Sequence, residues 1–133
     1  MKNLAFYILI LVSLTACKKD NLSNYSSNLI GKWSWIESCP GMRYSGCWYP
    51  GSFYQAYDIV FDPDSTYNVF HLDTLKSSCK FHAYKFLNDQ NHLVYILKFE
   101  SGSTNMYLVS HDTLHITNSE GVLTITSRYK KIK

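Results

Sequence analysis

Hydrophobic and polar positions alternate along much of this chain, and a period of two predicts β-strands. Every second residue from Leu93 to Phe99 is apolar or aromatic, and the run 122–129 shows a similar alternation. This pattern is typical of strands with one buried and one exposed face.

Eight runs rich in Tyr, Val, Ile, Phe, Trp and Thr follow one another at short intervals. No helix of ten residues fits between them. The predicted strands are Ile30–Ser38, Ala56–Phe61, Thr66–Leu72, Cys79–Leu87, His92–Phe99, Asn105–Ser110, Thr113–Thr117 and Val122–Tyr129.

Short segments rich in Asp, Asn, Ser, Gly and Pro separate several of these strands. Segments 62–65, 88–91, 100–103 and 118–121 have hairpin length, so neighbouring strands are expected to pair antiparallel. A meander of eight strands removes its free edges by closing on itself. The sequence therefore predicts an all-β fold, an eight-stranded antiparallel up-and-down β-barrel over residues 29–133, whose interior is either filled by side chains or holds one small ligand.

The beginning of the chain has the pattern of a secretory signal. A short basic start is followed by the apolar run Leu4–Leu14 and by Thr15 and Ala16 before Cys17. A transmembrane anchor is the alternative, but a span needs about 20 apolar residues and this run has about half that number. The pattern resembles a bacterial lipobox, which implies a signal peptide at 1–16 and a lipid on Cys17.

A lipid on Cys17 places the protein in the cell envelope, with the membrane as its first partner. Two or more acyl chains, such as palmitate, anchor a protein stably. Lys18 provides no acidic inner-membrane retention signal, so the outer membrane is expected, with its periplasmic or surface face left open. Segment 17–28 is predicted to be the lipidated cysteine and a flexible tether.

Composition supports one folded domain after the signal. Hydrophobic residues make up 46% of the chain, aromatic residues 16% and charged residues 17%. The basic residues are scattered except at 130–133, where a solvated chain end is the simpler explanation. No nucleic-acid partner is indicated.

Gly31-Lys32-Trp33, followed by Trp35, resembles the Gly-x-Trp signature that opens lipocalins and small bacterial lipocalin-like lipoproteins. Segments 59–67 and 111–116 also look like the lipoprotein pattern. In that family the tryptophan closes one end of the barrel beneath an arginine of the last strand, which implies this role for Trp33 and Arg128. The Thr-Asp-Tyr motif of longer lipocalins and their final helix are missing here. The resemblance therefore implies a lipid-anchored barrel of largely unknown role, with no named ligand and no catalytic residues.

The leading hypothesis is a non-enzymatic barrel that binds a small apolar or amphipathic molecule inside or at its mouth. The predicted wall consists of aromatic residues and one leucine from the strands or their ends: Trp35, Tyr57, Phe61, Tyr67, Phe70, Tyr84, Phe86, Tyr95, Leu97 and Tyr107. The long segment 39–55 adds Trp48, Tyr49, Phe53 and Tyr54, which form either a lid over the interior or a plug in it.

A second hypothesis belongs to another functional class. In it the barrel is filled, and the outer surface binds a protein, for example as an enzyme inhibitor or as part of an envelope complex. The partner would be an envelope or host protein.

Three cysteines remain after Cys17. Cys39 and Cys47 bracket a loop with glycine and proline and are close enough to form a disulfide. Cys79 is able to pair with either of them, so the sequence leaves the connectivity open.

Neither a metal site nor a cofactor is expected. Cys79 and His82 lie three apart, which puts them on opposite faces of a strand, and His111 and His115 would be about 13 Å apart on one strand. His71 and Asp73 share a face, but Asp73 is explained by a turn. We find no nucleophile elbow or paired carboxylates, so the chain is not expected to be an enzyme.

Overall fold

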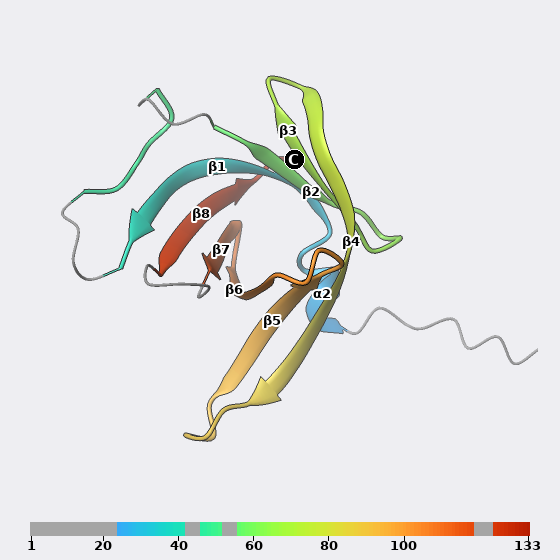
Figure 1. Ribbon diagram of the computed structural model, residues 1–133, viewed down its shortest axis with the longest axis vertical. Helices are drawn as coiled ribbons and strands as arrows, with labels where there is room; N and C mark the ends of the chain where they lie inside the picture. Colours follow the sequence, from blue (N-terminus) through green and yellow to red (C-terminus); the bar gives the residue numbers. More distant parts are fainter. Residues whose placement is uncertain (1–23, 42–45, 52–55, 119–123) are drawn as a thin grey trace, which may run out of the picture.

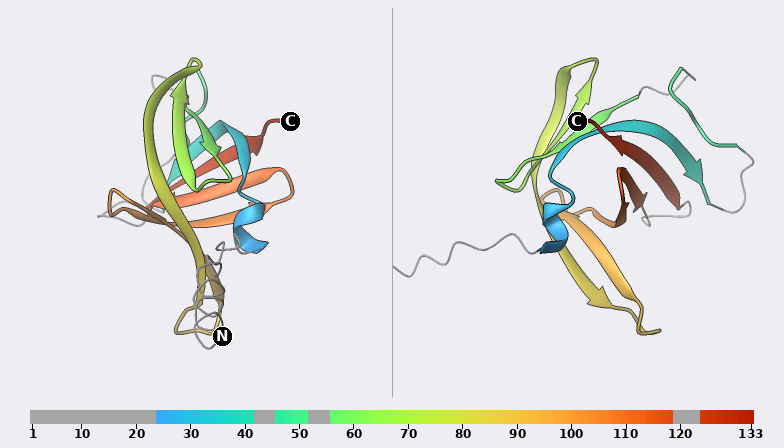
Figure 2. Two further views of the ribbon diagram at one scale, coloured as in Figure 1. Left: turned by 90° about the vertical axis from the view of Figure 1, so that its right-hand side faces the viewer. Right: turned by 180° about the vertical axis from the view of Figure 1, so that it is seen from behind.

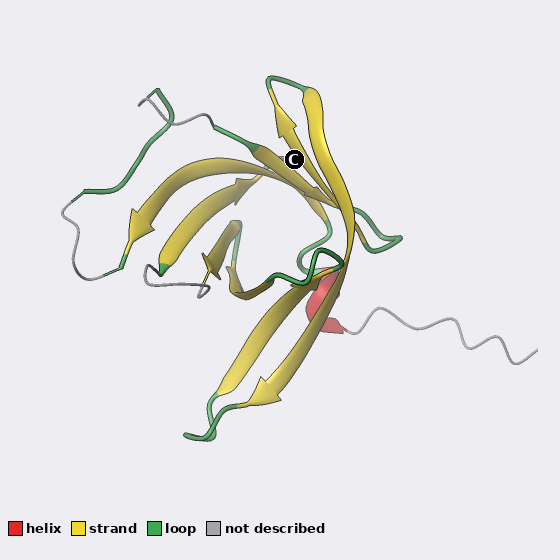
Figure 3. Ribbon diagram, viewed as in Figure 1, coloured by secondary structure: helices red, strands yellow, loops and turns green. Residues whose placement is uncertain are grey.

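The computed structural model describes residues 24–41, 46–51, 56–118 and 124–133. Eight antiparallel strands close into an up-and-down barrel in which each strand pairs with the next and β8 returns to β1 (Figures 1 and 3). This confirms the predicted fold class. The strands are β1 (Gly31–Pro40), β2 (Asp58–Phe61), β3 (Thr66–His71), β4 (Thr74–Leu87), β5 (Leu93–Phe99), β6 (Thr104–Ser110), β7 (Thr113–Asn118) and β8 (Ile125–Lys131).

The fourth strand is longer than the sequence predicts. Leu72 and Asp73 both have positive φ, so a two-residue turn joins β3 to β4. β4 therefore begins at Thr74, five residues before the predicted start at Cys79. The polar, exposed residues at this end of β4 explain why its hydrophobic pattern did not reveal the strand.

A register shift in β1 decides which side chains face the interior. Trp33 and Trp35 face inward in simple alternation, and the pairing with β8 shifts between Trp35 and Glu37. Such a bulge adds one residue and reverses the following alternation. Ser38 is therefore buried on the same side as Trp35.

One part of the interior is filled by side chains. This packed core is formed by Leu29, Trp33, Ile59, Phe61, Phe81, Leu97 and Leu114, each with at most 1% of its surface exposed. The ring centroids of Phe61 and Phe81 are 5.0 Å apart in an edge-to-face arrangement, which is a favourable aromatic geometry. Burial of these side chains is the main stabilising contribution to the barrel.

A short helix precedes the barrel. α2 (Asn24–Ser27) packs against β4, and the Leu29 backbone N–H donates to the Ser26 carbonyl at 3.0 Å. Leu29 in turn accepts a hydrogen bond from Trp33 Nε1 at 2.7 Å. A helical turn thus lies inside the predicted tether, directly before the packed core.

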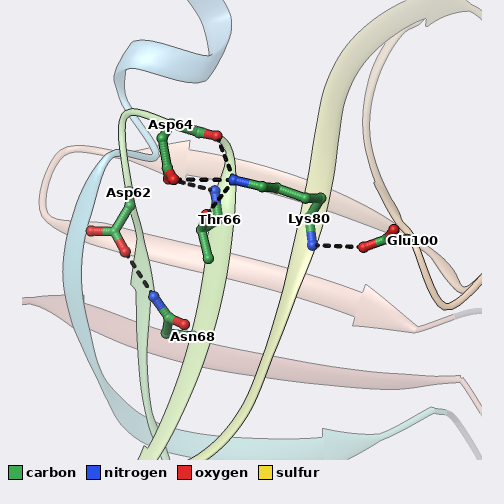
Figure 4. A network of polar contacts seen from close by, with 6 residues as sticks. All are labelled: Asp62, Asp64, Thr66, Asn68, Lys80 and Glu100. Atoms are coloured by element: carbon green, nitrogen blue, oxygen red, sulfur yellow. Dashed lines mark hydrogen bonds and ion pairs between the residues drawn. The ribbon is translucent and has the colours of Figure 1, made fainter.

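A polar network holds the β2–β3 turn against β4 (Figure 4). Lys80 Nζ lies 3.0 Å from Asp64 Oδ2 and donates to Thr66 Oγ1 at 2.7 Å. The hydrogen bonds from Thr66 and Lys80 lower the pKa of the Asp64 carboxyl. Because Asp64 and Lys80 are exposed, this network is a turn-stabilising feature rather than a buried charged site.

The β4–β5 hairpin projects beyond the rest of the barrel (Figures 1 and 2). β3 pairs with β4 only up to Lys80, and β6 pairs with β5 only over Tyr95–Lys98. The part of the hairpin nearer its turn therefore has no named strand of the described structure on either edge.

Candidate ligand-binding cavity

The interior contains a space of about 290 Å³ that is partly open to solvent. We call it the interior cavity. Its walls come from β1, from β8 and from the segments that connect β1 to β2. They are formed by Trp35, Ser38, Trp48, Tyr57, Ile125, Ser127 and Tyr129.

Hydroxyl groups give the interior cavity a polar side. Trp35 Nε1 donates to Ser38 Oγ at 2.9 Å, and the hydroxyls of Ser38 and Ser127 are 2.7 Å apart. The bulge in β1 makes this contact by turning Ser38 inward, opposite Ser127. An apolar ligand would therefore meet aromatic walls and a small hydroxyl cluster, which is a common composition of small-molecule pockets.

A second cavity of about 230 Å³ lies beside the first and shares three β8 residues with it. We call it the second cavity. It is lined by Tyr67, Phe99, Asn105, Ile116, Asn118, Ile125, Ser127 and Tyr129.

Asn105 places an unsatisfied acceptor at the wall of the second cavity. Its Oδ1 is buried and has no hydrogen-bond partner among the described residues. Buried carbonyl groups without a partner are costly and uncommon. A molecule in this cavity that carries an N–H or O–H group would satisfy the acceptor.

Burial raises the pKa of two tyrosines in these walls. Desolvation, with a smaller contribution from the neighbouring Tyr129, raises the pKa of Tyr67 far above its usual range. Desolvation also raises the pKa of Tyr129, against a hydrogen bond from Ser127 that lowers it. Like ordinary phenols, both are neutral at physiological pH and offer a hydrogen-bonding hydroxyl beside the cavities, and burial extends this neutral form to more alkaline pH.

The segment after β1 is fastened over the interior cavity at two points. Cys39 and Cys47 form a disulfide, which confirms the predicted pair and leaves Cys79 as the free cysteine of the described residues. Ser38 and Trp48 exchange two backbone hydrogen bonds of 3.0 and 2.8 Å. Together these links hold Trp48 at the cavity wall.

The loop aromatics predicted as a lid or plug have different positions. Trp48 lines the interior cavity, as does the half-exposed Tyr57. Tyr49 is 52% exposed and does not belong to the lining residues. Phe53 and Tyr54 lie outside the described residues.

The structure divides the rest of the predicted wall. Trp35 lines the interior cavity and Tyr67 the second one, whereas Phe61 and Leu97 belong to the packed core. Tyr95 and Tyr107 also pack against that core, and both line two further spaces, one that extends from β5 to β8 and one bordered by β5, β6 and Asn28.

Three positions of the predicted wall need correction. Tyr84 and Phe86 are 39% and 46% exposed and lie on the projecting hairpin. Phe70 pairs with Asp58, whose side chain is on the outward-facing side of β2, and it lines neither the interior cavity nor the second cavity. In β3, Tyr67 and Val69 face the core, so Phe70 faces the other side of the sheet. In β4, Ala83 faces the core, so Tyr84 and Phe86 face away from it.

The residue that places a positive charge over Trp33 at the end of the barrel also differs from the prediction. Lys131 Nζ, not Arg128, lies over the Trp33 ring, 5.0 Å from its centroid. Lys131 is the register partner of Trp33, whereas Arg128 pairs with Glu37 and makes a 2.9 Å ion pair with its carboxylate. The register of β8 therefore assigns the role expected for Arg128 to Lys131.

Glu37, Cys39 and Cys47 lie close enough together to suggest a metal cluster. The two cysteines are joined in the disulfide, so they offer no thiolate, and Glu37 pairs with Arg128. This cluster is thus accounted for by covalent and ionic bonds.

These features define a closed eight-stranded up-and-down β-barrel with two adjoining interior cavities. No protein-family model matches the chain, and no curated protein matches it. Among solved structures, a match is found to a crystal structure of a mutant of the fluorescent protein UnaG. It is 14% identical in sequence, the match covers 80% of this chain and 98% of that chain, and the TM-score is 0.41.

Proposed function

We propose that this chain is a non-enzymatic, lipid-anchored envelope protein whose barrel binds a small apolar or amphipathic molecule. The observation that carries the ligand-binding part is the pair of adjoining cavities, which leave Asn105 Oδ1 buried and unpartnered. These cavities and the unpartnered acceptor favour a barrel that binds a molecule inside over one that acts only through its outer surface.

The lining residues narrow the class of ligand. Trp35, Trp48 and Tyr57 offer flat aromatic surfaces, which suit an aromatic or conjugated group. The hydroxyls of Ser38 and Ser127 and the Asn105 acceptor suit a hydrogen-bonding end. Among the described residues, no Asp, Glu, Lys or Arg side chain lines either cavity, which favours a neutral ligand or one whose charge stays in solvent.

The anchoring part of the proposal rests on the sequence pattern that ends at Cys17. Among the residues that the structure describes, no helix has the length and apolar character to cross a membrane. Mass spectrometry of the N-terminal peptide from the membrane-isolated chain tests this part alone. A diacylglycerol-modified cysteine at position 17 is expected, whereas an unmodified Met1 start contradicts the anchor.

The binding part is tested by titrating the protein with 1-anilinonaphthalene-8-sulfonate while tryptophan fluorescence is followed. Trp35 and Trp48 line the interior cavity, so the bound probe is expected to quench their emission. Ser127→Phe fills the space between the two cavities and should abolish the quenching.

Ser78→Phe is the matched control because it makes the same substitution at an exposed position on β4, away from the cavities. It should leave the quenching unchanged. Equal binding by Ser127→Phe and the original chain would show that the probe binds outside the barrel and would contradict the proposal.

A further inference from the structure

The projecting β4–β5 hairpin exposes apolar side chains on both of its faces. Tyr84 and Phe86 lie on one face of the hairpin. Leu87 lies on the other face, opposite Leu93 of β5. Phe86, Leu87 and Leu93 are 46%, 62% and 47% exposed. A hairpin that buries neither face is marginally stable in water, and apolar groups gathered in this way mark a contact surface.

The base of the hairpin lies beside the start of the described chain. α2 packs against β4, and Asn28 lines a small space of about 130 Å³ together with Tyr95 of β5. Figures 1 and 2 show α2 next to the point where the hairpin leaves the barrel. The segment that leads back to Cys17 therefore begins at the hairpin end of the molecule.

The tether and the hairpin are long enough for both to reach the same membrane surface. Asn24 comes seven residues after Cys17, and seven residue steps span at most about 25 Å. Ala83 packs against the core, and Leu87 comes four residues later, which is about 13 Å along a strand. A bilayer that holds a lipid on Cys17 is thus within reach of the hairpin.

The charges of the hairpin also suit a lipid surface. Over residues 81–99 the charged side chains are Lys85, Lys98 and Asp89, with His82 and His92 beside them. With the histidines neutral the balance is a single positive charge, so the charge of the hairpin does not oppose contact with anionic headgroups. Tyr84 and Phe86 are aromatic types that sit readily at a membrane interface.

From these observations we propose that the turn end of the β4–β5 hairpin dips into the membrane, so that apolar side chains on both of its faces reach the level of the headgroups and upper acyl chains. This inference rests on the proposed lipid anchor at Cys17. The barrel is then oriented by two contacts, the lipid and the hairpin, and not by the tether alone.

The test uses the chain isolated with its lipid from cell membranes and reconstituted into vesicles of phosphatidylethanolamine and phosphatidylglycerol. In a Cys79→Ser background, Phe86→Cys carries an NBD fluorophore. Leu75→Cys is the matched control because Leu75, at 52%, is about as exposed as Phe86 but lies at the other end of β4. Leu93→Cys reports from the second face of the hairpin and replaces the first variant if Phe86→Cys does not fold.

Lipids brominated on their acyl chains are expected to quench the label at positions 86 and 93 several-fold and to leave position 75 unchanged. Equal emission at all three positions, with the lipid mass present on Cys17, would overturn the hairpin contact and leave the anchor intact. An absent lipid mass would contradict the anchor and remove the inference with it. If the lipid-free Cys17→Ser chain forms a dimer in buffer that already shields position 86, a second copy covers the hairpin and the proposal is wrong.

Discussion

Trp33 and Trp35 lie two residues apart on the same face of β1, yet they belong to different parts of the barrel interior. Trp33 is fully buried in the packed core, where its indole N–H donates to a backbone carbonyl. Trp35 borders the interior cavity, where its indole N–H donates to the Ser38 hydroxyl. The same strand thus contributes stability at one point and ligand-accessible surface at the next, and the bulge after Trp35 turns Ser38 toward the cavity.

Trp33→Ala should have the largest effect because it empties the centre of the packed core. We expect a loss of about 3–5 kcal/mol in the free energy of unfolding. Trp35→Ala enlarges a space that already exists, so its expected loss is roughly 1–3 kcal/mol. Urea unfolding followed by circular dichroism measures both, and equal losses would contradict the distinction between core and cavity.

Removal of the disulfide should come second. Cys39 and Cys47 are eight residues apart, and the chain-entropy model gives a loop of this size about 2.5 kcal/mol. The double variant Cys39→Ser with Cys47→Ser should unfold at a correspondingly lower urea concentration.

In the same variant the anilinonaphthalene probe should quench the tryptophan fluorescence less, because Trp48 loses one of its two links to β1. Cys79→Ser serves as the control and is expected to keep the probe response. Unchanged binding in the double variant would show that the backbone contacts of Ser38 suffice to place Trp48.

Alkaline pH should destabilise the cavity walls in a graded way. Burial raises the pKa of Tyr67 and Tyr129 in the folded protein, while the unfolded chain ionises near pH 10. Their contribution is therefore fully present below about pH 10 and is lost as pH rises toward the folded values, by about 1.4 kcal/mol per pH unit for each tyrosine.

Unfolding free energies measured from pH 8 to 11 test this dependence. Tyr129→Phe should show a shallower decline above pH 10 than the original chain. An identical slope in Tyr129→Phe and the original chain would contradict the assignment.

The smallest expected effect concerns the cation over Trp33. Lys131→Met removes the contact with the ring and should cost about 0.5–1 kcal/mol. Arg128→Met breaks a partly exposed ion pair with Glu37, for which about 0–0.5 kcal/mol is expected. A larger loss from Arg128→Met than from Lys131→Met in urea unfolding would favour the family-like arrangement over the observed one.

The barrel could be predicted from the sequence because strands and turns are specified by local patterns, the alternation of apolar residues and the residues that favour turns. Asp73 and Asn91 occupy turn positions with positive φ, which their side chains tolerate. The limits of β4 were harder to find, since residues 74–78 are polar except for Leu75 although the strand continues through them.

The candidate site was less predictable because it depends on the facing direction of side chains after a bulge. Ser38 and Ser127 meet only because the register of β1 shifts against β8. Tyr84 and Phe86 look like wall residues in the sequence, but their phase turns them away from the interior. Asn105 gave no signal at all, since its unpaired oxygen is a property of the folded interior.

The central claim is that the interior cavities bind a small molecule, and native mass spectrometry of the membrane-isolated chain before and after unfolding tests it most directly. The account predicts a bound mass that is released on unfolding and is absent from Ser127→Phe but present in Ser78→Phe. A bare polypeptide carrying only its N-terminal lipid in all three proteins would contradict the claim and favour a barrel that works through its outer surface.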